Sequence, residues 1–133
     1  MKTISIIYVL TVISISLNPD ICNSQYSDNY AAGLNGSNSY VAVPWHSELQ
    51  PTNAITVEAW IYPTALPSGS ACIIGKNYVS SYYFGIENTG RFIFIPRNQA
   101  GGFLRSRVTG TLKVNQWTHI AGTYDGTTTR LYI

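Results

Sequence analysis

The sequence predicts an all-β fold in which two antiparallel sheets pack as a sandwich. After the first 24 residues, short runs of β-branched and aromatic residues recur at even spacing, separated by turns rich in Gly, Pro and Asn. The clearest of these runs alternate apolar and polar residues with a period of two, as half-buried strands do. No segment after the N-terminal leader repeats apolar residues at i, i+3, i+4 and i+7 over the length of a helix.

The N-terminus has the pattern of a secretory signal peptide. Lys2 precedes an apolar run from Ile4 to Leu17 that carries no charge and is shorter than the about 20 residues of a membrane-spanning helix. Small residues lead up to Ser24, so we expect residues 1–24 to be removed there. An N-terminal anchor that is not cleaved is the alternative.

The remaining chain is long enough for one domain with a buried core. We expect a lead-in over 25–33 and a β domain over 34–133. Charged residues make up 11% of the chain, against about 25% in typical proteins. The net charge of +2 is too small to indicate a polyanion partner, so no nucleic acid is expected. We expect a secreted or cell-surface protein that meets a membrane only through its signal segment during export.

The first strand of the domain is expected over Ser39–Val43, and Pro44 ends it because proline cannot donate to a ladder. Asn35-Gly36-Ser37 before it is typical of a turn, and it also matches the acceptor motif for N-glycosylation.

The clearest strand covers Ile55–Tyr62, after a loop over 45–53. Its polar face includes Glu58, which we expect to point into solvent. Its apolar face is the predicted core, and consists of Ile55, Val57, Ala59 and Ile61.

Further strands are expected in the middle of the chain, over Cys72–Lys76, Tyr82–Glu87, Arg91–Ile95 and Phe103–Val108. Asn88-Thr89-Gly90 joins the second and third as a hairpin loop. Cys72 lies in an apolar run and has no cysteine partner in the mature segment, which predicts a buried and inert thiol. A reactive thiol, or a partner outside this sequence, is the alternative.

The chain finishes with a predicted hairpin. Trp117–Tyr124 alternates as a strand, Asp125-Gly126 favours a tight turn, and Thr129–Ile133 begins another strand. Because that strand stops at the last residue, we expect the fold to be incomplete at the C-terminus.

Three blocks together resemble the laminin G-like (LamG-like) jelly-roll domains of the concanavalin A-like superfamily. They occur in the family's order and span about 34–133, and they are Leu34–Val41, Ile55–Pro63 and Asn115–Gly126. The resemblance implies an antiparallel jelly-roll sandwich that serves as a non-catalytic module of a larger secreted or surface protein, often binding glycans or proteins. The sequence departs from the family pattern, because the Asn-Gly turn expected after Ile133 is absent.

Some members of this family bind calcium at the rim of the sandwich, which implies calcium as a cofactor to consider. Asn35 and Asp125 are the residues within the family blocks that are candidate ligands. Calcium takes six to eight oxygen ligands, and the mature chain has only five acidic residues. Turn chemistry explains both residues without a metal.

No pair of carboxylates suits glycoside hydrolysis, which needs two such groups flanking the scissile bond. Glu58 is the only acid on its strand, and we expect His119 to have a structural role. We therefore predict no enzymatic activity for this segment.

Loop aromatics and arginines are the candidate binding residues, and we single out Trp45, Tyr82 and Arg105. Arg105 is one of four arginines between 91 and 107, which form either a patch for sulfated glycans or nucleic acid, or dispersed solvated charges. The predicted function is recognition of a glycan or an extracellular protein. A fragment of an extracellular carbohydrate-active enzyme and a structural spacer are the alternatives, and the sequence does not indicate the oligomeric state.

Overall fold

The computed structural model of the chain describes residues 31–51, 53–76, 81–97, 106–107 and 111–133. The predicted signal peptide over 1–24, most of the lead-in over 25–33, and Arg105 lie outside the described residues. Among the described residues, no helix has the length and apolar character needed to cross a membrane.

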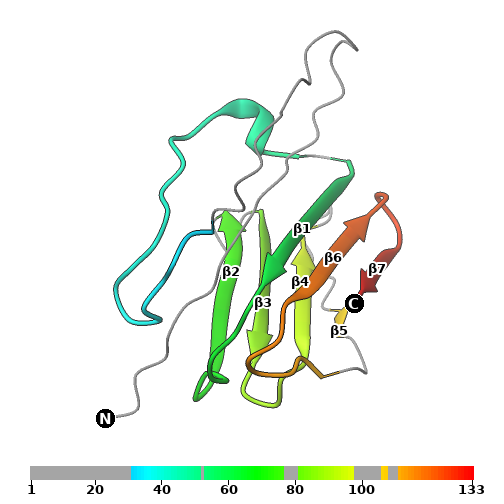
Figure 1. The fold of residues 1–133 in the computed structure, drawn as a ribbon. Coiled ribbons are helices and arrows are strands. Elements are labelled where there is room, and N and C mark those ends of the chain that lie inside the picture. The colour runs from blue at the N-terminus through cyan, green and yellow to red at the C-terminus, as the bar shows by residue number, and fades with distance from the viewer. Residues whose placement is uncertain (1–30, 52, 77–80, 98–105, 108–110) are drawn as a thin grey trace, which may run out of the picture.

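Two antiparallel sheets form the predicted sandwich (Figure 1). One sheet has the order β1-β6-β7 and consists of β1 (Ile55–Ile61), β6 (Thr118–Tyr124) and β7 (Thr129–Tyr132). The other has the order β2-β3-β4-β5 and consists of β2 (Ser70–Lys76), β3 (Tyr82–Glu87), β4 (Phe92–Pro96) and β5 (Ser106–Arg107). A short 3₁₀ helix, η1 (Ser47–Leu49), precedes β1. The all-β, two-sheet prediction is confirmed.

The two sheets face each other so that strands at corresponding sides of the two sheets lie together. β1 lies on the same side as β2, whereas β7 lies against β4 and β5 on the other side (Figure 1). One side of the sandwich is therefore bounded by the edges of β1 and β2, and the loop with η1 lies near one end of that side (Figure 1).

The predicted core face of β1 is confirmed. Val57, Ala59 and Ile61 are buried, and Ile55 is partly buried against the same core. The antiparallel register with β6 runs from Ile55 opposite Tyr124 to Ile61 opposite Thr118. This register aligns the inward residues of the two strands, because side chains alternate between faces.

Three phenylalanines from the other sheet fill the centre of the core. Phe84, Phe92 and Phe94 are fully buried, and the Phe84 ring meets the other two edge-on at centroid distances of 5.4 and 5.9 Å. Gly122 of β6 faces them. A Cβ atom at this position would lie 2.8 Å from the Phe94 ring, so only glycine allows the sheets to approach this closely.

The predicted hairpin turns are present. Gly90 has φ +78° and Gly126 has φ +97°, conformations that residues with a Cβ rarely adopt. Gly90 accepts a hydrogen bond from the Leu112 backbone N–H at 2.8 Å, which ties the β3–β4 turn to the segment that leads into β6.

The prediction of a strand over Ser39–Val43 is wrong for this structure. The segment has no ladder partner in the described part of the chain, and Tyr40, Val41 and Val43 are largely exposed. The residues have the propensity for a strand, but a strand also needs a neighbour to take its backbone hydrogen bonds. Of the strand predicted over Phe103–Val108, the described residues contain only β5.

The predicted burial of Cys72 is also wrong, because Cys72 is exposed. A β-bulge between Cys72 and Ile74 breaks the alternation of β2, so that Ile73 and Ile74 both pack against the core while Cys72 lies outside. Although the residue as a whole is exposed, neighbouring groups partly desolvate its thiol, and this desolvation raises the pKa of the thiol above the ordinary value. A raised pKa reduces the thiolate fraction, and with it the reactivity.

Candidate binding site

Trp45 lies in the loop before η1 and is 74% exposed. The Lys76 ammonium, at the end of β2, lies 5.5 Å from the centre of its ring and donates a hydrogen bond to the His46 carbonyl at 3.2 Å. The His46 ring accepts a hydrogen bond from the Glu48 backbone N–H at 3.4 Å and so caps η1. These contacts hold the Trp45 loop against the end of β2.

Tyr82 begins β3 and pairs with Lys76 across the ladder. It packs against the core, and burial, with a smaller contribution from the charge of Cys72, raises the pKa of its hydroxyl. Lys76 therefore contacts Trp45 and neighbours Tyr82, which brings two of the predicted binding residues to one end of the sandwich. Arg105 lies outside the described residues, and the binding role of all three stays a prediction.

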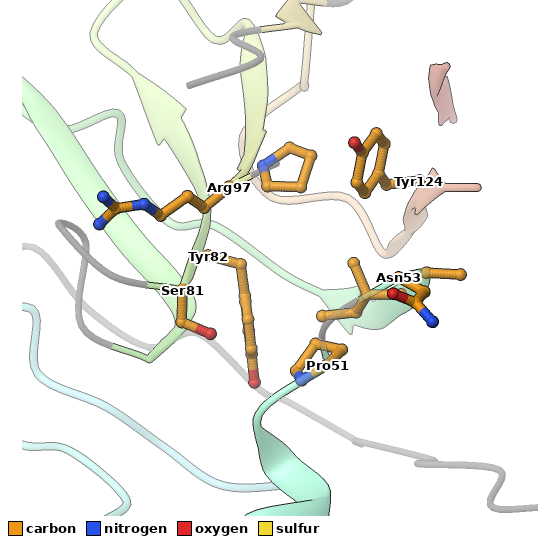
Figure 2. Close-up of a pocket in the computed structure, with 9 residues that line it drawn as sticks. Pro51, Asn53, Ser81, Tyr82, Arg97 and Tyr124 are labelled. Carbon is orange, nitrogen blue, oxygen red and sulfur yellow. The ribbon is translucent and has the colours of Figure 1, made fainter. Parts of the chain in front are cut away.

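A small hollow adjoins Tyr82 at this end, between β3 and the start of β1 (Figure 2). Its volume is about 10 Å³, enough for one water molecule. Ser81 lines it, and its buried hydroxyl has no hydrogen-bond partner in the described part of the chain. The Arg97 side chain extends away from Tyr124 and Asn53 (Figure 2). The hollow suits a water molecule on Ser81 rather than a ligand.

A larger pocket of about 190 Å³ lies between β1 and β2 and also has Tyr82 in its lining. We call it the edge pocket. It is lined by residues from η1, the following loop and three strands, namely Glu48, Leu49, Pro51, Ala54, Ile55, Thr56, Val57, Glu58, Ile74 and Tyr82.

The two candidate calcium ligands are each engaged in their own turn. The side-chain oxygen of Asn35 accepts hydrogen bonds from the backbone N–H groups of Ser37, Asn38 and Ser39 at 3.0–3.1 Å. These N–H dipoles converge on the oxygen with their positive ends, which opposes a cation there.

Asp125 is engaged in the same way. One carboxylate oxygen accepts hydrogen bonds from Thr127 and Thr128, and the other lies 2.8 Å from the Arg130 guanidinium. These bonds, led by the one from Thr128, hold the pKa of Asp125 far below its usual range. The described residues contain no cluster of three or more His, Cys, Asp or Glu side chains suited to a metal ion. The turns as arranged do not fit calcium, and the calcium assignment stays a prediction.

The outward face of the three-stranded sheet carries a second group of aromatic side chains. The register of β1 with β6 places Trp60 opposite His119, and their ring centres are 5.2 Å apart. Just beyond the ladder, the rings of Tyr62 and Trp117 lie 5.6 Å apart. Trp60 is 48% and Trp117 45% exposed, so both present ring surface to solvent.

Polar groups lie within this surface. A Glu58 carboxylate oxygen is 3.3 Å from Nε2 of His119, and both side chains are more than a third exposed. The expectation that Glu58 points outward is thus met, with His119 as its partner. We call the five residues Glu58, Trp60, Tyr62, Trp117 and His119 the outer-face cluster.

Sequence reasoning missed this cluster as a binding surface. Alternation assigns Trp60 and Tyr62 to one outward face, and Trp117 and His119 to another, but it does not show that these two faces adjoin. Pairing the predicted strand Ile55–Tyr62 antiparallel to the predicted strand Trp117–Tyr124 would have brought the two sets together.

The family comparison agrees with this fold. The family model described as the concanavalin A-like lectin/glucanases superfamily, a laminin G model, matches residues 35–133. The chain belongs to this superfamily. Laminin G-like domains are typically extracellular binding modules and are generally non-catalytic.

The chain is also similar to a curated protein, Sushi domain-containing protein 2 from Homo sapiens. The two are 29% identical over 94 residues, which cover 70% of this chain and 11% of that protein. The chain thus spans about a tenth of the length of the curated relative it matches. No solved structure gives a significant match.

Proposed function

We propose that this laminin G-like domain is a secreted or cell-surface recognition module that binds glycans through the outer-face cluster, as part of a larger protein. The observation that carries the proposal is the pairing of Trp60 with His119 and of Tyr62 with Trp117 on one exposed sheet face. Aromatic rings offer large apolar faces, and sugars present C–H faces of matching size.

The polar groups of the cluster support the same ligand class. Glu58 and His119 lie beside Trp60, so hydroxyl groups of a stacked sugar meet an acceptor and a ring nitrogen there. The side chains stand on two hydrogen-bonded strands, so that little conformational entropy is lost on binding.

We infer that the domain does not cleave the glycan it binds. On β1, β6 and β7, Glu58 is the only acidic residue, whereas glycoside hydrolysis uses two carboxylates across the scissile bond. A protein ligand is the second candidate, because exposed Trp and Tyr are also favoured in protein interfaces.

Glycan-array binding with purified variants tests the proposal. We expect Trp60→Ala and Trp117→Ala each to weaken binding about tenfold or more, since stacking on an aromatic face is lost. Trp45→Ala removes a Trp that is even more exposed, in the loop near Tyr82, and is the matched control. Binding that depends on Trp45 and Tyr82 but not on Trp60 and Trp117 would place the ligand at the end of the sandwich instead.

A further inference from the structure

Asn35-Gly36-Ser37 is the only stretch of the full sequence that matches the Asn-X-Ser/Thr acceptor motif for N-glycosylation, in which X is any residue except proline. The motif marks a modification site only where the folded chain leaves room for a bulky, hydrophilic glycan on the Asn side chain. The exposure of the motif, the contacts of the Asn35 amide and the place of the Ser37 hydroxyl therefore decide whether the motif can be used.

The motif lies on the surface of the molecule. Its three residues are all exposed, and they lie outside the helix and strands of the structure. The cyan segment that carries them stands clear of both sheets (Figure 1). A glycan on Asn35 can therefore extend into solvent without displacing a core side chain or interrupting the ladder of a sheet.

The contacts of the Asn35 amide leave one of its hydrogens for substitution. The oxygen accepts hydrogen bonds from the backbone N–H groups of Ser37, Asn38 and Ser39, and the nitrogen donates one hydrogen bond to Oδ1 of Asn38 at 2.7 Å. An amide nitrogen carries two hydrogens, and a glycan replaces only one of them. All the hydrogen bonds of this turn can therefore persist when a sugar takes the place of the other hydrogen.

The hydroxyl of Ser37 takes no part in the turn. Ser37 contacts Asn35 through its backbone N–H, in an Asx turn, and Gly36 between them has φ +69°, which glycine adopts at no steric cost. The hydrogen bonds to the Asn35 oxygen join residues at most four positions apart, so the turn does not depend on the completed sandwich. Backbone groups and the Asn35 oxygen thus hold the turn, while the Ser37 hydroxyl and one amide hydrogen of Asn35 remain outside it.

We propose that Asn35 is the acceptor of an N-linked glycan, attached during export of the chain. The donor is an oligosaccharide activated as a lipid-linked diphosphate. A bond forms between Nδ2 of Asn35 and the anomeric carbon of the sugar, the bond from that carbon to the diphosphate oxygen breaks, the lipid diphosphate leaves with the electron pair, and Nδ2 loses one proton. This modification goes beyond the proposed glycan recognition, and it rests on only one part of the proposed function, which is passage through the secretory pathway.

The test uses the full chain with its own N-terminal segment, produced in eukaryotic cells whose secretory pathway performs N-glycosylation. The chain recovered from the medium should migrate more slowly on a denaturing gel than the same chain treated with a glycosidase that hydrolyses the bond between Asn and glycan. This hydrolysis leaves Asp in place of the modified Asn, so peptide mass spectrometry should find Asp at position 35 after treatment and should find the other Asn residues unaltered.

Three variants separate the motif from the turn. Ser37→Ala should abolish the gel shift, because the motif loses its hydroxyl while the backbone N–H still donates to Asn35. Ser39→Ala is the matched control, since it removes another exposed hydroxyl from a residue whose backbone N–H also donates to Asn35, and it should leave the shift unchanged. Asn35→Asp keeps an oxygen that accepts the backbone hydrogen bonds but has no amide nitrogen, so it should abolish the shift while the chain is still exported.

Several results would overturn the proposal, and they distinguish it from the proposed function. An exported chain without a glycan on Asn35 would exclude the modification and leave secretion and glycan recognition standing. A chain that stays inside the cells without a glycan would exclude export and modification together. A gel shift that persists in Ser37→Ala, or one that Ser39→Ala removes as completely as Ser37→Ala does, would show that this motif does not direct the modification.

Discussion

The close contact at Gly122 makes Gly122→Ala the sharpest test of how the two sheets pack. A Cβ atom here would lie 2.8 Å from two atoms of the Phe94 ring and 3.2 Å from the Phe84 ring, and both rings are fully buried. Neither ring has open space to move into, because each also packs edge-on in the phenylalanine group.

Overpacking of this kind costs about 1–3 kcal/mol. Against this, alanine reduces the conformational entropy of the unfolded chain and contributes about 0.4–1 kcal/mol of stability. The net loss should be about 1–2 kcal/mol, which lowers the unfolding temperature of a domain of this size by about 4–15 °C.

Gly69→Ala is the matched control. A Cβ atom at Gly69 meets nothing within 4 Å, so only the gain from the unfolded state applies and stability should stay equal or rise slightly. Thermal and urea unfolding of both variants against the unaltered chain measures the difference. Equal stability of Gly122→Ala and Gly69→Ala would refute the packing of β6 against the Phe84 and Phe94 rings.

Three further predictions concern turn chemistry, calcium and the thiol. Asp125→Ala should destabilise the domain at pH 7; because the pKa of Asp125 is lower in the folded than in the unfolded state, its contribution is present above about pH 4 and is lost as pH falls toward the folded pKa. Unfolding at pH 7 and pH 2 should show the difference between the two proteins shrinking, and a difference independent of pH would contradict this. Millimolar calcium should leave the unfolding temperature unchanged, because the Asn35 and Asp125 oxygens already accept several hydrogen bonds; a rise that Asp125→Asn abolishes would show the opposite. Iodoacetamide at pH 8 should modify Cys72 in the folded chain, since it is exposed, but more slowly than in urea, since its pKa is raised; equal rates would contradict the raised pKa.

Local patterns predicted much of the fold because the physics behind them is local. The alternation of Ile55 to Ile61 specifies which face of β1 is buried, and Gly90 and Gly126 stand where the turns need positive φ. Ser39–Val43 has the same local character but lacks a neighbouring strand among the described residues, and no local pattern contains that information. The bulge beside Cys72 is likewise a property of two paired strands.

The candidate sites were harder to predict for the same reason. Trp45 and Tyr82 stand out as aromatic residues near loops, and Lys76 links their surroundings. The outer-face cluster depends on the register that places Trp60 opposite His119, and the edge pocket depends on how β1, β2 and η1 meet in space. Residues about 60 positions apart in the chain form the outer-face cluster, and residues up to 34 positions apart line the edge pocket.

Glycan binding at the outer-face cluster is most directly tested by nuclear magnetic resonance. The chain has three Trp residues, so the indole N–H groups of Trp45, Trp60 and Trp117 give three separate reporters. On titration with a glycan that the array identifies, the Trp60 and Trp117 signals should shift together with a single dissociation constant, while the Trp45 signal should stay in place. A titration that shifts the Trp45 signal and leaves those of Trp60 and Trp117 unchanged would contradict the account.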